Sequence, residues 1–337
     1  MKILVTGGAG YIGSHTCLEL LNAGYETVVM DNLCNASKQS MERVENLSGK
    51  KICFYEEDLL NEEALDQIFE KEKPEAVIHF AGLKAVGESV EKPLEYYINN
   101  INGTLNLLNI MRKHKVYKFV FSSSATVYGA PETVPIKEDF PLSVTNPYGR
   151  TKLMIEDILR DLSFADKNFD IVALRYFNPI GADKSGMIGE DPNGIPNNLV
   201  PYITQVIIGK REYVRVYGND YPTPDGTGVR DYIHVTDLAK GHIKAIEFMA
   251  GTRGFHVFNL GTGKGYSVLD VIHSFEKVIG REIPYQIIER RPGDVAECYA
   301  DPSLAERDLK WKAQYGILEM CEDAYRWQSM NPNGYEQ

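Results

Sequence analysis

Cysteine and histidine are scarce in this chain, and neither is arranged as a metal or disulfide site. Five Cys and seven His are scattered over 337 residues. An odd number of cysteines without a C-x-x-C spacing fits neither a disulfide framework nor a zinc site. No two histidines stand four residues apart. We therefore expect no metal ion and a reducing, cytoplasmic compartment.

Basic residues are outnumbered, and long apolar runs are missing. The 36 Lys and Arg stand against 47 Asp and Glu, which gives a formal net charge of −11. This balance argues against nucleic acid and anionic membranes, because binding to either requires a basic face. No apolar run approaches the roughly 18 residues of a transmembrane helix. The sequence thus predicts a protein that binds small molecules.

Short apolar runs alternate with helix-length segments through the first half of the chain. Strands are expected at 2–6, 27–31, 51–55, 76–81, 118–123 and 170–176. Helices are expected between them at 12–23, 61–71, 93–114 and 147–166. Strands that are apolar on both faces and alternate with helices form parallel sheets covered on both sides. The pattern predicts a Rossmann-type, doubly wound α/β fold.

The second half of the chain differs from the first in composition and in its expected elements. Residues 181–198 are rich in Gly, Pro, Asn and Asp, which predicts a long irregular segment. Helices then follow at 198–208, 236–249, 267–279 and 318–328, with strands at 214–217, 256–260 and 285–289. We predict a cofactor domain at 1–176 and a smaller α/β lobe at 177–337. That lobe would cover the carboxyl ends of the strands, where open α/β sheets bind their ligands.

A glycine-rich loop, G-G-A-G-Y-I-G at 7–13, joins the first strand to the first helix. Gly8, Gly10 and Gly13 match the G-x-G-x-x-G fingerprint, in which glycine permits a tight turn and a close approach of a pyrophosphate to the helix amino end. The alternative is a turn that only packs a helix on a strand. The position of the motif at the first strand-helix junction favours a dinucleotide.

Asp31 ends the second strand, 18 residues after Gly13. A carboxylate about 20 residues beyond the glycines binds the adenosine ribose diol. It would also repel a 2′-phosphate. The spacing predicts NAD rather than NADP, against the alternative that Asp31 merely begins a turn with Asn32.

Tyr148 and Lys152 are four residues apart and share one face of a predicted helix. Their context matters more than their spacing, because the helix follows a strand that ends in three serines, the last being Ser124. Tyrosine is a poor base near neutrality, with a pKa of about 10. A nearby ammonium and a cationic nicotinamide would favour the phenolate, and the serine would bind the reacting oxygen. The alternatives are a surface Tyr-Lys pair and a serine run that only ends a strand.

Several motifs together resemble a known family. They include T-G-G-A-G-Y-I-G-S-H at 6–15, S-S-S-A-T-V-Y-G at 122–129, the Tyr148/Lys152 pair and L-R-Y-F-N-P at 174–179. This set resembles the extended short-chain dehydrogenase/reductase family. The segments G-I-P-N-N-L at 194–199, G-V-R-D-Y-I-H-V at 228–235 and R-R-P-G-D at 290–294 look like the branch that epimerises UDP-sugars at C4. The resemblance runs from Met1 to about Tyr335.

The resemblance implies interconversion of UDP-glucose and UDP-galactose on a tightly held NAD, with a 4-keto sugar as intermediate. Catalysis would fall to Tyr148, Lys152 and Ser124. The cofactor residues implied are Gly7, Gly10, Tyr11, Ile12, Gly13, Asp31, Asn32, Asn35, Asp58, Leu59, Phe80, Ala81, Gly82, Lys84, Asn99, Ser124, Tyr148, Lys152, Tyr176 and Phe177. The substrate residues implied are Lys84, Ser124, Tyr148, Asn178, Asn198, Leu199, Arg230, Arg291, Asp294 and Cys298.

Cys298 bears on substrate breadth, since the family position it matches lines the sugar pocket and is either bulky or small. A cysteine there leaves room for UDP-N-acetylglucosamine and UDP-N-acetylgalactosamine. The alternative is a small buried residue without a role in selectivity. Family members usually dimerise through the helices expected here at 93–114 and 147–166, so the resemblance implies a homodimer.

Two other functions compete with the epimerase. A sugar-nucleotide 4,6-dehydratase shares the fold, NAD and the Tyr148/Lys152 pair, but it needs an acid-base pair beside the catalytic hydroxyl. Ala125 and Thr126 follow Ser124 here, and neither is a carboxylic acid. A non-catalytic NAD-binding sensor would need the glycine loop alone. The intact reactive residues disfavour that reading.

Overall fold

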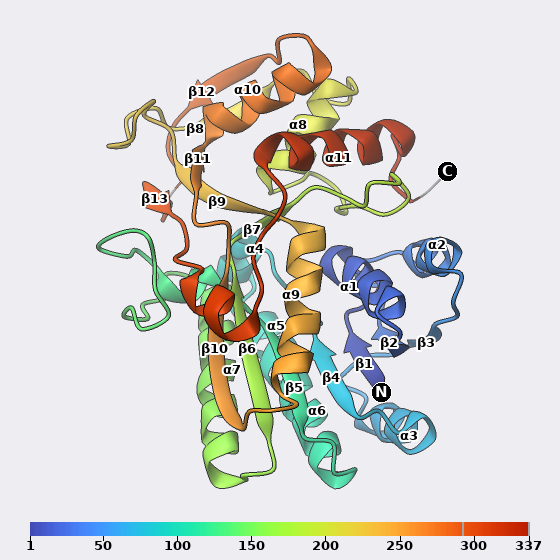
Figure 1. Cartoon of the computed structure of the whole chain (residues 1–337). Helices are drawn as coiled ribbons and strands as arrows, with labels where there is room; N and C mark the ends of the chain where they lie inside the picture. Colours follow the sequence, from blue (N-terminus) through green and yellow to red (C-terminus); the bar gives the residue numbers. More distant parts are fainter. Residues whose placement is uncertain (292, 336–337) are drawn as a thin grey trace.

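A seven-stranded parallel sheet forms the larger lobe of the computed structural model, which describes residues 1–291 and 293–335. Its order is β10-β6-β5-β4-β1-β2-β3, and every neighbouring pair is parallel (Figure 1). The strands are β1 (Lys2–Thr6), β2 (Glu26–Asp31), β3 (Cys53–Glu56), β4 (Ala76–His79), β5 (Lys118–Ser124), β6 (Asp170–Tyr176) and β10 (Gly254–Leu260). The predicted doubly wound fold is confirmed.

The apolar strands are buried on both faces, as the sequence pattern requires. Ile3 and Val5 belong to one hydrophobic cluster, whereas Leu4 between them belongs to another. Successive side chains of a strand point to opposite faces, so the two clusters are the cores on the two sides of the sheet. Each core needs its own layer of helices.

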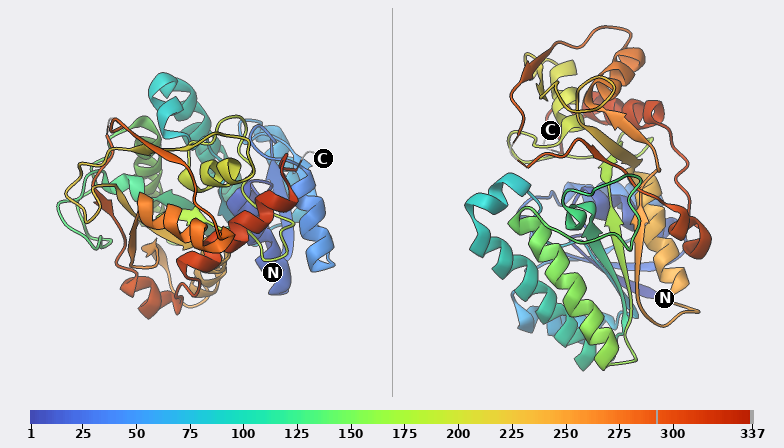
Figure 2. Two further views of the ribbon diagram at one scale, coloured as in Figure 1. Left: turned by 90° about the horizontal axis from the view of Figure 1, so that it is seen from above. Right: turned by 90° about the vertical axis from the view of Figure 1, so that its left-hand side faces the viewer.

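Helices supply both layers. One face packs against α1 (Tyr11–Asn22), α2 (Gln39–Ser48) and α9 (Val235–Phe248). The other packs against α3 (Glu62–Glu72), α6 (Gly103–Lys113) and α7 (Pro147–Ala165). The right-hand view of Figure 2 shows α6 and α7, in teal and green, across the sheet from α9 in light orange. No helix in the described part of the chain is long and apolar enough to cross a membrane.

The segment between β4 and β5 differs from its prediction. A single helix is expected over 93–114, but the structure has α5 (Pro93–Tyr97), a π-helical turn at Ile98–Asn102 and then α6. A further short helix, α4 (Val86–Glu91), precedes them, and α2 was also absent from the predictions. A π-helical turn inside a longer helix frequently marks a functional site.

The smaller lobe lies above the carboxyl ends of the main strands (Figure 1). It combines α8 (Leu199–Ile207), α10 (Val268–Ile279) and α11 (Ile317–Met330) with two small sheets. In one sheet, β9 (Val229–His234) pairs with β7 (Asn178–Ile180), β11 (Gly265–Ser267) and β13 (Glu297–Cys298). In the other, β12 (Tyr285–Ile288) pairs with β8 (Val214–Tyr217).

The chain returns to the large sheet after residue 176. The segment expected as a strand at 256–260 is β10, which pairs with β6 along its whole length, and α9 before it packs on α1. The prediction that β10 belongs to the second lobe is wrong, because local sequence does not show which distant strand a segment pairs with. The large sheet and its helix layer therefore take β10 and α9 from the part of the chain beyond residue 176.

Candidate active site

The glycine loop lies where the strand order reverses, between β1 and β4. Such a switch point is where open α/β sheets bind ligands. Gly7 has a φ of +71°, and a Cβ there would lie 2.6 Å from the backbone N of Ala81. A Cβ on Gly13 would lie 2.3 Å from the carbonyl oxygen of Gly7. Both positions therefore require glycine, and the loop is packed tightly against the end of β4.

The amino end of α1 is free to receive an anion. Gly10 precedes the helix without a capping side chain, and no acidic residue occupies the first turn. A Cβ on Gly10 would meet only the carbonyl oxygen of Gly7, at 3.4 Å. Backbone N–H groups at an uncapped helix start attract phosphate. This arrangement fits the pyrophosphate of a dinucleotide.

Asp31 fastens the glycine loop as well as ending β2. One carboxylate oxygen accepts from the backbone N–H of Ala9 (3.0 Å) and the other from that of Leu33 (2.9 Å). Burial raises the pKa of Asp31, and these backbone hydrogen bonds oppose the rise. At the next strand end, the Asn32 amide donates to Asp58 (2.7 Å). The predicted ribose carboxylate thus lies at the expected edge of the sheet.

Asn100 was missed by the sequence predictions. Its amide oxygen accepts from the backbone N–H of Leu83 (2.8 Å), and its amide nitrogen donates to the carbonyl of Leu83 and the hydroxyl of Thr151, both at 3.0 Å. It thereby ties the segment after β4, which carries Gly82 and Lys84, to α7. The only signal in the sequence was the cluster of asparagines at 99–102 within a predicted helix.

The Tyr148/Lys152 pair stands at the start of α7, on the face that meets the end of β5. Asn146 caps the helix by accepting from the N–H of Gly149 (2.8 Å), and Pro147 occupies its first turn. The Lys152 ammonium donates to the carbonyl of Ser122 (2.7 Å) and lies 5.9 Å from the centre of the Tyr148 ring. The structure brings the predicted reactive residues together.

Burial acts in opposite directions on the two groups. It raises the pKa of Tyr148 to about 12, although a hydrogen bond with Ser124 opposes the rise. It lowers the pKa of Lys152 to about 8, although the negative charge of Glu156 opposes the fall. Ammonium and phenol therefore face each other at neutral pH. A further positive charge beside Tyr148 would favour its phenolate.

Aromatic side chains surround Tyr176 and Phe177, which the family resemblance assigns to the cofactor site. The Tyr176 hydroxyl contacts Nε2 of His242 (2.8 Å), and the Phe80 ring lies 4.6 Å from the His242 ring. Because Nδ1 of His242 must donate to the carbonyl of Leu238 (2.9 Å), Nε2 accepts and Tyr176 donates. Burial lowers the pKa of His242 to about 4, so the imidazole is neutral. Phe177 is buried directly after Tyr176.

Cationic side chains of the predicted substrate site are paired within the chain. Lys84 lies 3.7 Å from Glu190, which also accepts from the Asn198 amide (2.9 Å). Arg230 on β9 lies 3.8 Å from Asp294. The sequence contains no sign of Glu190, which lies in the irregular segment at 181–198. It also contains no sign that these cations pair with carboxylates of the chain.

Arg291 lies over the ring of Tyr217, with its guanidinium carbon 3.7 Å from the ring centre. Burial would raise the pKa of Tyr217, but hydrogen bonds with Arg291 and Arg215 lower it overall. Tyr217 ends β8 and was also missed by the predictions. Of the remaining predicted residues, Asn178 and Leu199 begin β7 and α8, Asn99 lies in the π-helical turn, Leu59 is buried after β3, and Asn35 is exposed.

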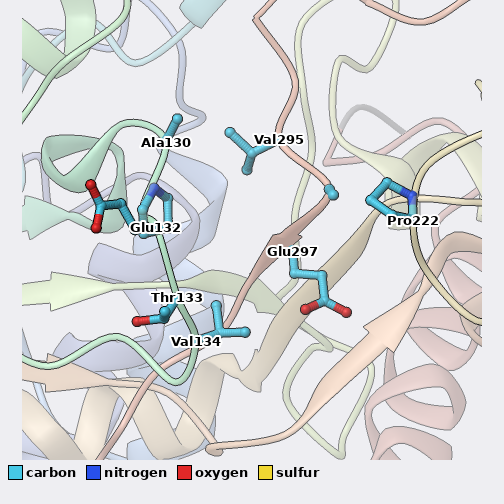
Figure 3. A pocket seen from close by; sticks show the side chains of 9 residues that line it. Ala130, Glu132, Thr133, Val134, Pro222, Val295 and Glu297 are labelled. Atoms are coloured by element: carbon cyan, nitrogen blue, oxygen red, sulfur yellow. The ribbon is translucent and has the colours of Figure 1, made fainter.

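A cavity of about 410 Å³ lies between the 130–134 loop and residues 295–297, with Pro222 at one side. Figure 3 shows the Glu297 side chain directed into the space between Val134 and Pro222. Ser124, Tyr148 and Lys152 are not among the residues that line the cavity, so it is distinct from the site of these three side chains. Cys298, the next residue on β13, instead packs on an apolar cluster that includes Phe177 and Ala125.

Comparison with known proteins defines the group to which this chain is related. A family model described as GDP-mannose 4,6 dehydratase matches residues 4–324. The UDP-glucose 4-epimerase of Bacillus subtilis is 63% identical over 336 residues, which cover 100% of this chain and 99% of that protein. The chain belongs to the UDP-glucose 4-epimerase family. The family resemblance seen in its motifs is confirmed.

Solved structures of the epimerase family have the same fold. The crystal structure of UDP-glucose 4-epimerase from Bifidobacterium longum, in complex with NAD⁺ and UDP, superposes with a TM-score of 0.96 at 55% identity and covers 99% of this chain and 100% of that one. The enzyme from Stenotrophomonas maltophila, with bound NAD and formylated UDP-arabinopyranose, has a TM-score of 0.97 at 46% identity, over 98% and 99% of the two chains.

Proposed function

We propose that this chain interconverts UDP-glucose and UDP-galactose by epimerisation at C4 with bound NAD. The observation that carries the proposal is the convergence of Ser124, Tyr148 and Lys152 at the carboxyl edge of the sheet, beside a glycine loop open to a diphosphate. The membership of the chain in the UDP-glucose 4-epimerase family supports the same reaction.

Each reactive side chain has a defined task. Tyr148 holds the proton of the sugar O4 and returns it, while the Ser124 hydroxyl donates to the same oxygen as negative charge develops. Lys152 favours the phenolate of Tyr148 by its positive charge. NAD, when bound, supplies the acceptor and later the donor of the hydride at C4. The two lobes enclose the 4-keto sugar and exclude water from it.

The remaining residues bind the two nucleotides. We assign the cofactor to residues 1–176, with the pyrophosphate at 7–13 and the adenosine ribose at Asp31. The UDP-sugar falls to the lobe that begins near residue 177. Arg230 and Arg291 are suited to its diphosphate, because guanidinium groups bind phosphate with two parallel hydrogen bonds.

A 4,6-dehydratase remains the second candidate, because the matching family model carries that description. Water elimination needs a carboxylic acid next to the catalytic hydroxyl. Ala125 is buried there, and the Thr126 hydroxyl donates a hydrogen bond to Ser124 Oγ (3.0 Å). The segment thus lacks the acid that a dehydratase would use.

The deciding experiment is incubation of the purified protein with UDP-galactose and no added cofactor. We expect UDP-glucose as product and NAD in the supernatant after denaturation. A 4-keto-6-deoxy sugar would identify a dehydratase. Nucleotide release without any turnover would identify a sensor. Either result would overturn the proposal.

We further propose that the site accepts UDP-N-acetylglucosamine and UDP-N-acetylgalactosamine. The support is the small, half-buried Cys298, whose strand neighbour Arg230 belongs to the substrate site. Cys298→Tyr should abolish turnover of the N-acetylated sugars and retain that of UDP-galactose. Cys298→Ala, which keeps the space open, should retain both. Equal turnover of N-acetylated sugars by all three proteins would remove Cys298 from selectivity.

A cytoplasmic homodimer completes the proposal. Apolar side chains are exposed on the helices expected at the interface, namely Leu94 (70%), Ile98 (51%), Leu105 (39%) and Met154 (39%). A second copy of the chain would cover them. Leu94→Glu should shift the sedimentation coefficient to that of a monomer, whereas Ile287→Glu on the other lobe should not. A wild-type protein that sediments as a monomer would refute the dimer.

A further inference from the structure

Glu156 is a fully buried carboxylate on the catalytic helix that the proposed chemistry does not use. It follows Lys152 by four residues and Tyr148 by eight, so the three side chains lie on one face of α7. A buried charge is unfavourable unless it is paired and fully hydrogen-bonded. The partners of Glu156 therefore indicate what it does.

Those partners come from two adjacent strands of the sheet. One oxygen of Glu156 accepts from the Ser123 hydroxyl (2.5 Å) and from Nε of Arg175 (3.0 Å), and the other accepts from Nη2 of Arg175 (2.6 Å). Arg175 is itself buried, and its Nη1 donates to the Tyr128 hydroxyl (2.9 Å) and the Glu138 carbonyl (3.1 Å). The pair joins α7 to β5 and β6 and is electrically balanced.

The contact with Ser123 falls in the middle of the reactive end of β5. Ser122 before it offers the carbonyl that holds the Lys152 ammonium (2.7 Å). Ser124 after it carries the hydroxyl that faces Tyr148. By binding Ser123, Glu156 thus holds the two residues on either side of it in place. These are Ser122, whose carbonyl accepts from Lys152, and Ser124, whose hydroxyl faces Tyr148.

Charge reinforces this mechanical link. The titratable and charged groups around Lys152 and Tyr148 come from several elements and are His79, Tyr96, Tyr128, Glu156, Arg175 and Tyr176. Burial lowers the pKa of His79 to about 3, so this histidine is neutral. The negative charge of Glu156 acts on Lys152 and favours its ammonium form.

We propose that Glu156 is a positioning residue for the epimerisation: it fixes the end of β5 through Ser123, and its charge, held in place by Arg175, keeps Lys152 an ammonium. The inference rests on the proposed function, since that function gives Lys152 and Ser124 their tasks. Glu156 is fully buried and bound by Ser123 and Arg175, so its effect reaches the reaction only through its neighbours.

Glu156→Gln tests the charge with little change of shape. In the NAD-loaded enzyme we expect kcat for UDP-galactose to fall about tenfold with KM unchanged, because a small misplacement of reacting groups affects the chemical step. The alkaline limb of the pH profile of kcat should move to lower pH by about one pH unit, because Lys152 loses a neighbouring negative charge. A pH profile identical to that of the wild type would overturn the proposal.

Ser123→Ala decides the case if Glu156→Gln does not fold. It removes one hydroxyl and leaves the Glu156–Arg175 pair intact. The matched control is Ser163→Ala, which removes a buried serine of α7 that donates to the Phe169 carbonyl (3.3 Å), away from the reactive end. We expect kcat to fall in Ser123→Ala only. Equal kcat in both variants and the wild type would contradict the proposal.

A measurement without turnover separates this inference from the proposed function. If the wild type fails to convert UDP-galactose, the proposed function is wrong. The ionisation of Tyr148 in the NAD-bound protein still reports on Glu156, through the ultraviolet absorbance of the phenolate in the difference between each protein and its Tyr148→Phe counterpart. We expect Tyr148 to ionise at higher pH in Glu156→Gln, because Lys152 then loses its ammonium charge at lower pH and no longer favours the phenolate. Ionisation at the same pH in both would overturn the inference.

Discussion

Two regions of the molecule differ in burial and in the length of their polar contacts. The first is the end of β5 with α7, and the second is the group of cationic side chains in the predicted substrate site. At the first, Lys152, Glu156 and Arg175 are each at most 5% exposed and are held by hydrogen bonds of 2.5 to 3.1 Å. At the second, the Lys84 side chain is 53% exposed and lies 3.7 Å from its carboxylate partner, and Arg230 lies 3.8 Å from Asp294.

The difference separates chemistry from recognition. Buried, fully bonded groups keep their geometry without a ligand, so the reactive centre is formed before substrate arrives. Exposed ion pairs contribute only about 0 to 1 kcal/mol each. A diphosphate can therefore displace the Glu190 carboxylate from the exposed Lys84 at little cost. Changes in the first region should alter kcat, and changes in the second should alter KM.

Tyr148→Phe should have the largest effect, because it removes the proton carrier and leaves the packing of the ring. We expect kcat to fall by about 10³-fold, with NAD still bound, as measured by turnover of UDP-galactose and by nucleotide released on denaturation. Tyr117→Phe, at the opposite edge of the sheet, should remain active. A fully active Tyr148→Phe would exclude this residue from the mechanism.

Arg291→Gln should come next and act on the other kinetic parameter. Loss of a charged phosphate contact should raise KM for UDP-galactose by about 10- to 50-fold, with kcat within about threefold of the wild type. The control is Arg211→Gln, an arginine of the same lobe that stacks on Tyr202 instead. If kcat fell as far as KM rose, the division between the two regions would fail.

The pH dependence of kcat should report on the buried region. Burial lowers the pKa of Lys152 to about 8, below its ordinary value, so the ammonium is present below that pH and is lost above it. We therefore expect kcat to decrease as pH rises through about 8. Lys152→Arg, which remains charged, should move this alkaline limb to higher pH while lowering the maximum. An unmoved limb would show that another group titrates.

Salt should have the smallest effect and act on the exposed region alone. Raising the ionic strength from about 0.05 to 0.5 M screens exposed charges and should raise KM about two- to fivefold, with kcat steady. Steady-state kinetics with UDP-galactose in NaCl measure both. A salt effect confined to kcat would reverse the comparison.

The predictions from sequence succeeded where a feature is written in consecutive residues. The glycine loop, Asp31 at a strand end and the Tyr148/Lys152 spacing are each visible in a short stretch of sequence, and periodicity placed β1, β6 and α7 almost to the residue. They failed where a contact joins distant segments. Asn100, Glu190 and Tyr217 carry no local pattern that distinguishes them from ordinary polar or aromatic residues.

Sequence alone determined the doubly wound fold, the place of the glycine loop between β1 and α1, and the position of Tyr148 and Lys152 on one helix, because side-chain period and motif spacing are local properties of the chain. Tertiary structure alone decided that β10 joins the large sheet, that Lys84 and Arg230 are already paired with carboxylates, and that Glu156 is bound to Ser123 and Arg175. These facts depend on which distant segments pack together, and burial then sets the charge of each group they enclose.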